Sequence, residues 1–183
     1  GSWFQIRNYI VGMPSPGLIP MTIGAAGIKI YEQVPFAKVY SASLNASYGI
    51  VSGLSVSGKA IYRRGFTNEQ LDLPMMQPFS YGLRLQYARN AFSTEASMEG
   101  AIKQSKFSPL FGETAAPAYT IASLGAGYQF KWKKNSFQVR GGVENLFSRY
   151  YTTFADWNRI PRMGRNLFLN LIIGFSEPLK AGL

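Results

Sequence analysis

Residues 39–48 read Val-Tyr-Ser-Ala-Ser-Leu-Asn-Ala-Ser-Tyr, so a polar residue stands at every second position after Val39. Successive side chains of a β-strand point to opposite faces of the sheet. One face would carry Tyr40, Ala42, Leu44, Ala46 and Tyr48, and the other Ser41, Ser43, Asn45 and Ser47. The stretch therefore predicts a strand with one apolar face that is bounded by tyrosines and one polar face.

The same alternation recurs along the chain, where helical periodicity is absent. It predicts eight strands, at residues 3–11, 37–49, 54–66, 79–88, 93–106, 118–132, 136–150 and 164–175. About 9–11 residues suffice for a tilted strand to cross a bilayer, and no apolar run reaches the roughly 18 residues of a membrane helix. The sequence predicts an all-β, antiparallel transmembrane β-barrel.

Charges are confined to the polar face of these strands, and we interpret that face as the wall of a lumen. The predicted lumen residues are Lys59, Arg63, Arg84, Glu95, Glu99, Lys103, Arg140 and Glu144. A Lys or Arg in the middle of the other face would cost about 2–4 kcal/mol in lipid. Lys38 and Arg64 share the parity of the apolar face, but they lie beyond Tyr40 and Tyr62, where lipid head groups are expected.

Aromatic residues bound the apolar face at both ends. We expect one belt near the short turns and the chain end and a second toward the long loops, because amphipathic rings favour the membrane–water interface. The first belt comprises Tyr48, Tyr87, Tyr128, Phe130 and Phe175, and the second comprises Tyr40, Tyr62 and Tyr81.

Connections alternate in length, as they do in transmembrane barrels, whose short turns are periplasmic and whose long loops are extracellular. The short ones are 50–53, 89–92 and 133–135, and the long ones are 12–36, 67–78, 107–117 and 151–163. A soluble lipocalin-like barrel is the structural alternative, and it would have an apolar interior. The opposite charges on the polar face favour a wet or polar lumen instead.

Composition removes several functional classes. The 183 residues carry a net charge of +10 and contain neither Cys nor His. A disulfide framework, a thiolate metal site and a Ser-His-Asp arrangement are therefore excluded, and a barrel lipase or protease is disfavoured. The basic residues form no stripe that would bind nucleic acid, and they suit anionic lipid head groups. We expect no enzymatic activity and no cofactor.

The last third of the chain carries the most specific motif. Residues 142–151 read Gly-Val-Glu-Asn-Leu-Phe-Ser-Arg-Tyr-Tyr, and Ile-Pro-Arg-Met-Gly-Arg follows at 160–165. Together with Phe175, these segments resemble the C-terminal part of TonB-dependent outer-membrane receptors. The motif positions are Gly142, Val143, Glu144, Asn145, Leu146, Phe147, Pro161, Arg162, Gly164 and Arg165. Weaker likenesses at 37–40 and 113–120 extend the resemblance over essentially the whole chain.

The resemblance implies a receptor barrel of about 22 strands with a plugged lumen, of which residues 1–175 would be the C-terminal sector. It implies uptake of a metal chelate, siderophore, haem, vitamin or copper across the outer membrane of a Gram-negative bacterium. The partners would be membrane lipid, lipopolysaccharide, the plug domain, the upstream strands and the TonB complex. Residues 176–183 extend beyond the usual terminal aromatic residue, and we interpret them as a tail outside the barrel.

A small closed outer-membrane barrel with a structural or adhesion role is the alternative, because eight strands can close by themselves. The pairing of residues 3–11 distinguishes the two hypotheses. Pairing with 164–175 would indicate a closed barrel, whereas its absence would indicate a sector of a larger one.

Individual motif residues have more than one interpretation. Glu144 and Arg140 form a charge ladder on the wall in one reading, and Glu144 contacts the plug in the other. Arg159, Arg162 and Arg165 either fix the loop, face lipopolysaccharide or bind ligand. Thioethers suit copper(I), so we also consider a metal site at the methionines in or beside long loops, namely Met13, Met21, Met75, Met76 and Met163.

Overall fold

The computed structural model describes residues 1–15, 17–18, 27–156 and 159–175. These residues form one antiparallel sheet of eight strands in chain order, with a single 3-10 turn, η1. The elements are β1 Ser2–Ser15, β2 Ile28–Val51, β3 Leu54–Thr67, β4 Ser80–Arg89, β5 Phe92–Ala101, η1 Pro109–Phe111, β6 Tyr119–Trp132, β7 Asn135–Glu144 and β8 Asn166–Gly174. In this part of the chain, no helix is both long and apolar enough to cross a membrane.

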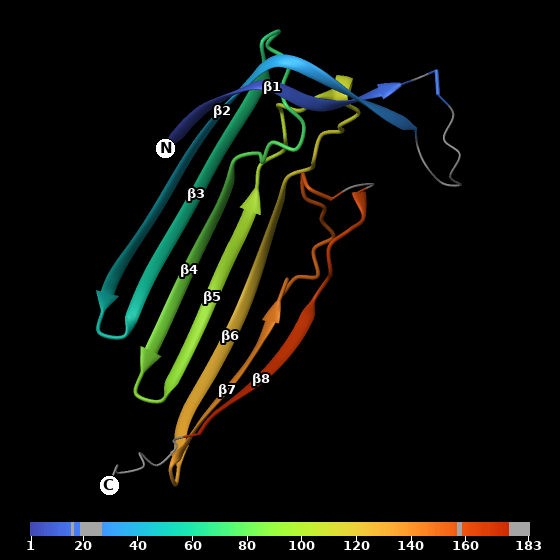
Figure 1. The fold of residues 1–183 in the computed structure, drawn as a ribbon. Helices are drawn as coiled ribbons and strands as arrows, with labels where there is room; N and C mark the ends of the chain where they lie inside the picture. Colours follow the sequence, from blue (N-terminus) through green and yellow to red (C-terminus); the bar gives the residue numbers. More distant parts are fainter. Residues whose placement is uncertain (16, 19–26, 157–158, 176–183) are drawn as a thin grey trace, which may run out of the picture.

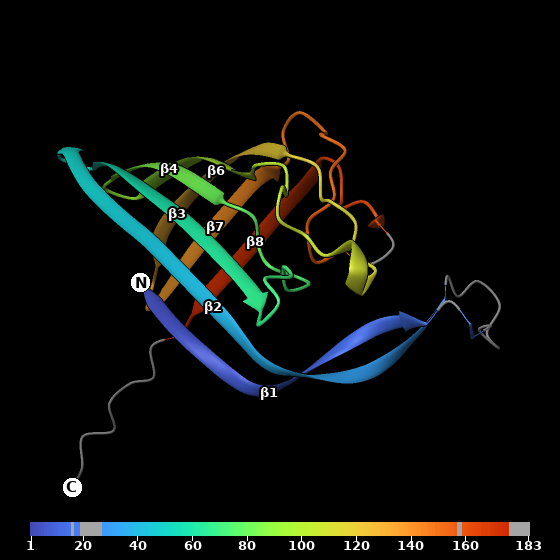
Figure 2. The same cartoon turned by 90° about the horizontal axis from the view of Figure 1, so that it is seen from above.

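The sheet is curved and open (Figures 1 and 2). β1 pairs with β2 and β8 pairs with β7, and within the described ranges no pairing joins β1 to β8. The closed eight-stranded barrel considered above is therefore not formed. The sheet is a partial barrel, as the sector hypothesis predicts.

Three two-residue turns join strands at the lower end of the sheet in Figure 1, namely Ser52-Gly53, Asn90-Ala91 and Lys133-Lys134. Each contains a residue with positive φ, at Gly53 (82°), Asn90 (55°) and Lys133 (56°). Tight hairpin turns require this conformation because it matches the twist of the paired strands. The long connections gather at the opposite end, so the predicted sorting of turns and loops is confirmed.

The first long connection is shorter than predicted. Much of 12–36 is strand, because β1 and β2 stay paired out to Ser15 and Ile28 and project as a two-stranded ribbon (Figure 2). The prolines of this segment had favoured a loop. Pro14 is tolerated because β1 is an edge strand, on which a missing backbone donor costs nothing in the ladder.

Two other strands are shorter than predicted. β5 ends at Ala101 and β7 ends at Glu144, whereas alternation had favoured ends at 106 and 150. After β7 the backbone turns at Asn145 (φ 47°) and Ser148 (φ 52°), both in the left-handed region. Hydrophobic alternation does not reveal such a turn, because the turn depends on backbone conformation and not on the pattern of apolar residues.

Cross-strand register keeps the two predicted faces continuous over the sheet. One apolar row runs through Tyr48, Val56, Leu85, Ala96, Leu124, Val143 and Leu167. The hollows of the sheet are lined instead by side chains of the other parity, including Arg84, Glu95 and Arg140. The polar face is thus the concave one, which excludes the lipocalin-like arrangement with an apolar interior.

The apolar outer face is exposed, with side chains such as Leu44, Leu167 and Leu169 among the most accessible of the molecule. The buried apolar cluster is small and lies near the loop end, where Leu73 packs with Ala37 and Val39. Gly65 permits this contact, because a Cβ there would lie 2.7 Å from Leu73 Cδ1. A chain with so small an interior and so apolar an outside is suited to lipid.

Candidate functional site

Glu95 is the centre of a polar network on the concave face. Its carboxylate lies 3.7 Å from Arg84 Nε and 3.6 Å from Arg140 Nη2, and it accepts a hydrogen bond of 3.0 Å from Gln86 Nε2. The Glu95 side chain is only 19% exposed, whereas both arginines are about half exposed. The contacts connect β4, β5 and β7, so they tie together strands that are not all neighbours.

A second ion pair also spans alternate strands. Lys59 Nζ of β3 lies 3.8 Å from Glu99 Oε2 of β5. Gly82 of β4 stands between them in register, and a Cβ at Gly82 would lie 2.7 Å from Lys59 Cε. The missing side chain leaves the space through which Lys59 reaches Glu99.

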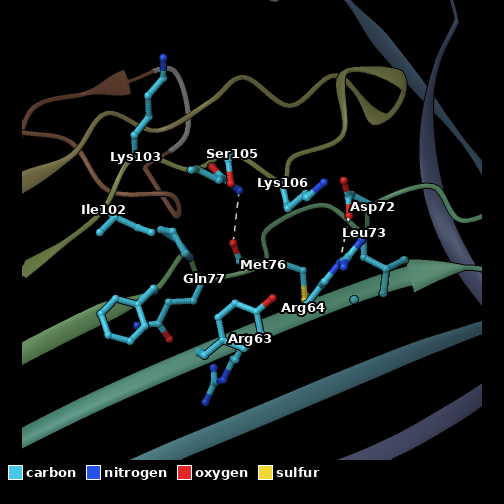
Figure 3. Close-up of a pocket in the computed structure, with 15 residues that line it drawn as sticks. Arg63, Arg64, Asp72, Leu73, Met76, Gln77, Ile102, Lys103, Ser105 and Lys106 are labelled. Carbon is cyan, nitrogen blue, oxygen red and sulfur yellow. Dashed lines mark hydrogen bonds and ion pairs between the residues drawn. The ribbon is translucent and has the colours of Figure 1, made fainter.

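The remaining predicted wall residues lie apart from this network. Arg63 and Lys103 line a pocket near the long loops (Figure 3), and Glu144 accepts a hydrogen bond of 3.0 Å from Asn166 Nδ2. Within the described residues no ion pair joins Arg140 to Glu144. Arg140 extends across β6 to Glu95 instead, and both interpretations of Glu144, as part of a charged wall and as a contact of the plug, stay predictions.

The network forms the floor of a concave hollow of about 640 Å³. The hollow extends from Arg84 and Glu95 up to the β7–β8 connection, where Tyr151, Arg162 and Met163 line it. Its lining mixes both charge signs with aromatic and thioether groups. Such a surface can hold a polar or charged solute in water, and within the described residues no cluster of acids could hold a metal ion.

Asn145 of the motif fixes the connection between β7 and β8. It is 2% exposed, and its Nδ2 donates to the carbonyl oxygens of Arg149 (2.8 Å) and Met163 (3.2 Å). Its Oδ1 accepts from the backbone N–H of Arg149 at 2.8 Å. One buried amide thus joins both ends of the loop, and this accounts for an Asn at the end of β7.

The motif arginines contact the loops themselves. Arg165 Nε donates to the carbonyl oxygen of Leu146 at 2.8 Å, and Arg159 Nε donates to Thr114 Oγ1 at 3.3 Å. Arg162 Nε donates to Asp156 Oδ2 at 2.9 Å. These contacts favour the loop-fixing interpretation of all three side chains.

Asp156 is held ionised within this loop. Burial tends to raise the pKa of its carboxyl, but hydrogen bonds from Arg162 and Thr153 outweigh burial and lower that pKa. The same contact with Asp156 raises the pKa of Arg162. The pair is therefore charged on both sides at neutral pH.

The other motif positions have separate roles in packing. A Cβ at Gly142 would lie 2.5 Å from Leu124 O and 2.6 Å from Phe168 Cζ, so this position accommodates the Phe168 ring. Leu146 N donates to Ala122 O at 2.7 Å, and Val143 pairs with Leu167 on the outer face. A Cβ at Gly164 would approach Ser148 Oγ at 3.0 Å. Phe147 and Pro161 are exposed.

Both predicted aromatic belts lie on the outer face. Tyr48, Tyr128, Phe130 and Phe175 are exposed near the turn end, and Tyr87 is half-buried there. Toward the loops, Tyr40 and Tyr62 are exposed, and the Tyr81 hydroxyl lies 2.6 Å from Thr120 Oγ1. Trp3, which sequence reasoning missed, extends this belt onto β1, with its ring 6.5 Å from that of Tyr40. Their interfacial role remains a prediction.

The methionines lie in different surroundings. Met13 is in β1, Met76 packs against the Leu73 cluster, and Met75 and Met163 are exposed in loops. Met21 lies outside the described residues, as does the tail 176–183. Only Met163 lines the hollow among the described methionines.

Sequence reasoning also missed two loop contacts. The Glu113 carboxylate accepts from the backbone N–H groups of Met75 and Ser108, both at 2.9 Å, and so connects two long loops. Tyr151 stacks on Tyr119 with ring centroids 4.7 Å apart at the mouth of the hollow. Burial, followed by the charge of Glu99, raises the pKa of the Tyr151 phenol. Neither contact has a periodic signature in the sequence.

Comparison with known proteins extends these observations. A family model described as "TonB dependent receptor-like, beta-barrel" matches residues 1–146. None of the curated proteins compared matches the sequence. The fold is similar to the solved "Copper transporter OprC", with a TM-score of 0.78 and 17% identity over 94% of this chain and 27% of that one.

A second solved structure is "The FrpB iron transporter from Neisseria meningitidis (F3-3 variant)", with a TM-score of 0.64 and 14% identity over 94% of this chain and 28% of that one. The chain thus spans about a quarter of the length of the structures it matches. Members of the matching family are transporters and not enzymes, and their barrels are Gram-negative outer-membrane proteins. Because the family model covers most of its length, this chain belongs to the TonB-dependent receptor-like β-barrel family.

Proposed function

We propose that this chain supplies barrel wall and extracellular loops to an outer-membrane receptor for TonB-dependent nutrient uptake. The observation that supports this most is the hollow on the concave face, which extends from the Glu95 network to the loop held by Asn145. A polar, charged wall below fixed loops suits the passage of a hydrated solute. In the proposed complete receptor, the upstream strands close the barrel, the plug domain fills its lumen and the TonB complex supplies energy.

The substrate is proposed from the classes that such receptors import, namely a metal chelate, a siderophore, haem, a vitamin or copper. Copper has a specific observation in its favour. Met163 is 73% exposed and lines the hollow beside Arg162, so its thioether is available to a soft ion. The structural similarity to a copper transporter supports testing this substrate first.

An uptake assay tests the proposal. The complete receptor is produced in a Gram-negative host with and without functional TonB, and cells are supplied with copper, radiolabelled ferric chelate, haem or cobalamin. We expect accumulation of one of these compounds to require both the receptor and TonB. Equal accumulation in cells with and without functional TonB would contradict the proposal.

A pair of variants tests the wall itself. Glu95→Gln combined with Arg140→Gln removes charge from the concave face, and Met98→Leu alters only the outer face. We expect the double variant to slow uptake while the Met98 variant transports normally. Equal uptake by both variants would show that the wall charges take no part in transport.

A further inference from the structure

The connection between β5 and β6, residues 102–118, is hydrogen-bonded to every other region at the loop end of the sheet. These regions are the β1–β2 ribbon, the β3–β4 connection and the β7–β8 connection. Figure 2 shows the yellow η1 segment between the ribbon and the orange β7–β8 connection. The largest fully buried side chains of the described residues also lie at this end, namely Phe111, Leu73, Gln104 and Thr67. Loops usually lie at the surface and open separately, so this burial indicates that the long connections pack as one unit.

The Glu113 carboxylate joins the β5–β6 connection to the β3–β4 connection. Its Oε1 accepts hydrogen bonds from Met75 N at 2.9 Å and from Gln104 Nε2 at 3.2 Å, and its Oε2 accepts one from Ser108 N at 2.9 Å. An ionised carboxylate fits this position because it only accepts hydrogen bonds. An amide of the same size would place its own donor against one of these donors in either orientation.

Gln104 strengthens the same junction from the buried side. It is 2% exposed, and its Nε2 also donates to Met76 O at 3.2 Å, the contact drawn as a dashed line beside Met76 in Figure 3. Its Oε1 accepts from Ala116 N at 3.2 Å. A buried amide that is bonded at both ends fixes its partners, because the loss of any of them would leave an unsatisfied polar group.

The ribbon is attached to the other side of the β5–β6 connection. Lys29 Nζ of β2 donates to Phe111 O at 2.7 Å, at the end of η1. The next residue, Gly112, has φ of 72°, and a Cβ there would lie 3.1 Å from Pro14 Cγ of β1. Both strands of the ribbon therefore meet the β5–β6 connection at one point.

The β7–β8 connection is attached by a hydrogen bond and by an aromatic stack. Arg159 Nε donates to Thr114 Oγ1 at 3.3 Å, and the Tyr151 ring stacks on Tyr119, which follows the β5–β6 connection. Tyr151 and Arg162 line the upper end of the hollow. The β5–β6 connection thus holds the segment that forms the mouth of the hollow, although its own residues 102–118 do not line that hollow.

We propose that the β5–β6 connection is a hub that holds the ribbon and the other long connections as one preformed mouth, with Glu113 as its positioning residue for solute capture. Glu113 contacts no solute in this role. It acts by holding the backbone of Met75 and Ser108 and, through the adjacent Thr114, the contact with Arg159. A mouth that is ordered before the solute arrives loses less conformational entropy on binding. The capture role rests on the proposed function, whereas the hub does not.

Hydrogen exchange of the complete receptor in detergent, followed by mass spectrometry, tests the hub. In Glu113→Gln we expect exchange over 71–78 and 104–116 to become roughly ten- to a hundred-fold faster, the factor that hydrogen bonds to a charged group contribute against local opening. Exchange over 149–165 should rise by a smaller factor, because Arg159 and Tyr151 keep part of their contacts. Exchange in β4 should stay unchanged, which shows that the variant is folded.

Two further variants separate the hub from a general loss of charge. Glu69→Gln removes the same charge from an exposed position of the β3–β4 connection and should exchange as the unmodified protein does. Thr114→Val removes the acceptor of Arg159, so exchange should rise over 149–165 and not over 71–78. A rise in Glu113→Gln that is confined to 104–116, or one no larger than in Glu69→Gln, would overturn the hub.

Uptake kinetics test the capture role. Uptake of copper, radiolabelled ferric chelate, haem and cobalamin is measured against concentration. For the compound that accumulates, Glu113→Gln should raise the half-saturation concentration about ten-fold at an unchanged maximal rate, because fewer receptors have an ordered mouth. Glu113→Asp, which keeps the carboxylate, should recover part of the affinity.

The outcomes of the two measurements are independent. A lower maximal rate at an unchanged half-saturation concentration would overturn the capture role of Glu113. If none of the four compounds accumulates in cells with the unmodified receptor, the proposed function fails, and the exchange measurements still decide whether the hub exists.

Discussion

Arg140 in β7 and Glu95 in β5 meet across β6, with Arg140 Nη2 and Glu95 Oε2 3.6 Å apart. The strand between them carries Gly125 opposite Glu95 and Gly127 opposite Arg140. At the second ion pair, Gly82 stands between Lys59 and Glu99, and a Cβ there would meet the Lys59 side chain. A glycine on the concave face thus leaves the space through which Lys59 reaches Glu99.

A double-mutant cycle tests the contact between Arg140 and Glu95. We expect a coupling free energy of about 0.2–1 kcal/mol between Glu95→Gln and Arg140→Gln, because the arginine is half exposed and solvent screens the pair. Unfolding by urea in lipid vesicles gives the free energies. Lys131→Gln is the control partner, since Lys131 lies about 20 Å along β6 from the level of Glu95. Coupling no larger than that control would contradict the contact.

Two glycine substitutions should differ in cost. A Cβ at Gly142 meets a backbone oxygen and the Phe168 ring, whereas a Cβ at Gly82 meets the flexible end of Lys59. We expect Gly142→Ala to lower the free energy of unfolding by about 1–3 kcal/mol, as overpacking does. Gly82→Ala should cost less than about 1 kcal/mol, the usual limit for an exposed ion pair. Urea unfolding measures both, and equal costs would argue against the packing described for Gly142.

Asn145 and Asn90 provide a matched pair for the loop. Both have left-handed φ, but only Asn145 makes side-chain hydrogen bonds within the described residues. Asn145→Gly keeps the backbone conformation and should cost about 1–3 kcal/mol, because buried backbone groups lose their partners. Asn90→Gly should be nearly neutral. Hydrogen exchange over residues 145–165 should increase only in the first variant, and unchanged exchange would refute the role of Asn145.

The β7–β8 connection should loosen only when the pH falls below the usual titration range of Asp. Folding lowers the pKa of Asp156. The ionised carboxylate therefore stabilises the folded loop fully above the ordinary Asp pKa, and this stabilisation is lost as pH falls through the lowered value. We therefore expect hydrogen-exchange protection of 151–165 to persist at mildly acidic pH and to fall only below the usual Asp range. Asp156→Asn should reduce protection at neutral pH and abolish this acid dependence. Loss of protection near neutral pH in the unmodified protein would contradict the sign.

Adjacent positions in β5 test which face meets lipid. Met98 belongs to the outer face and Ser97 to the concave face, beside Arg84 in register. Met98→Lys should lower stability in bilayers by about 2–4 kcal/mol, because a charge enters the hydrocarbon. Ser97→Lys should cost much less, since its side chain stays in water. Folding yields and urea unfolding in vesicles distinguish the two, and a reversed order would contradict the orientation of the sheet.

Much of the fold was predictable from local sequence. Alternation identified all eight strands and assigned Leu85 and Arg84 to opposite faces. The turns at Gly53 and Asn90 were also evident, because tight hairpins need residues that tolerate positive φ. The ends of β5 and β7 and the long ribbon of β1 and β2 were not predicted, since edge pairing and single left-handed residues override the alternation.

The candidate site was likewise predictable only in part from the sequence. The sequence determined that Glu95, Arg140 and Glu144 share the polar face, because residues separated by even steps along a strand point the same way. Only the tertiary structure decided that Arg140 meets Glu95 instead of Glu144, and that Asn145 fixes the last loop. The contact between Arg140 and Glu95 depends on the register of β5, β6 and β7, which places two residues that are 45 positions apart in sequence within 3.6 Å. The face to which a side chain points is a local property of the strand, whereas the residue that it contacts is fixed only when the sheet assembles.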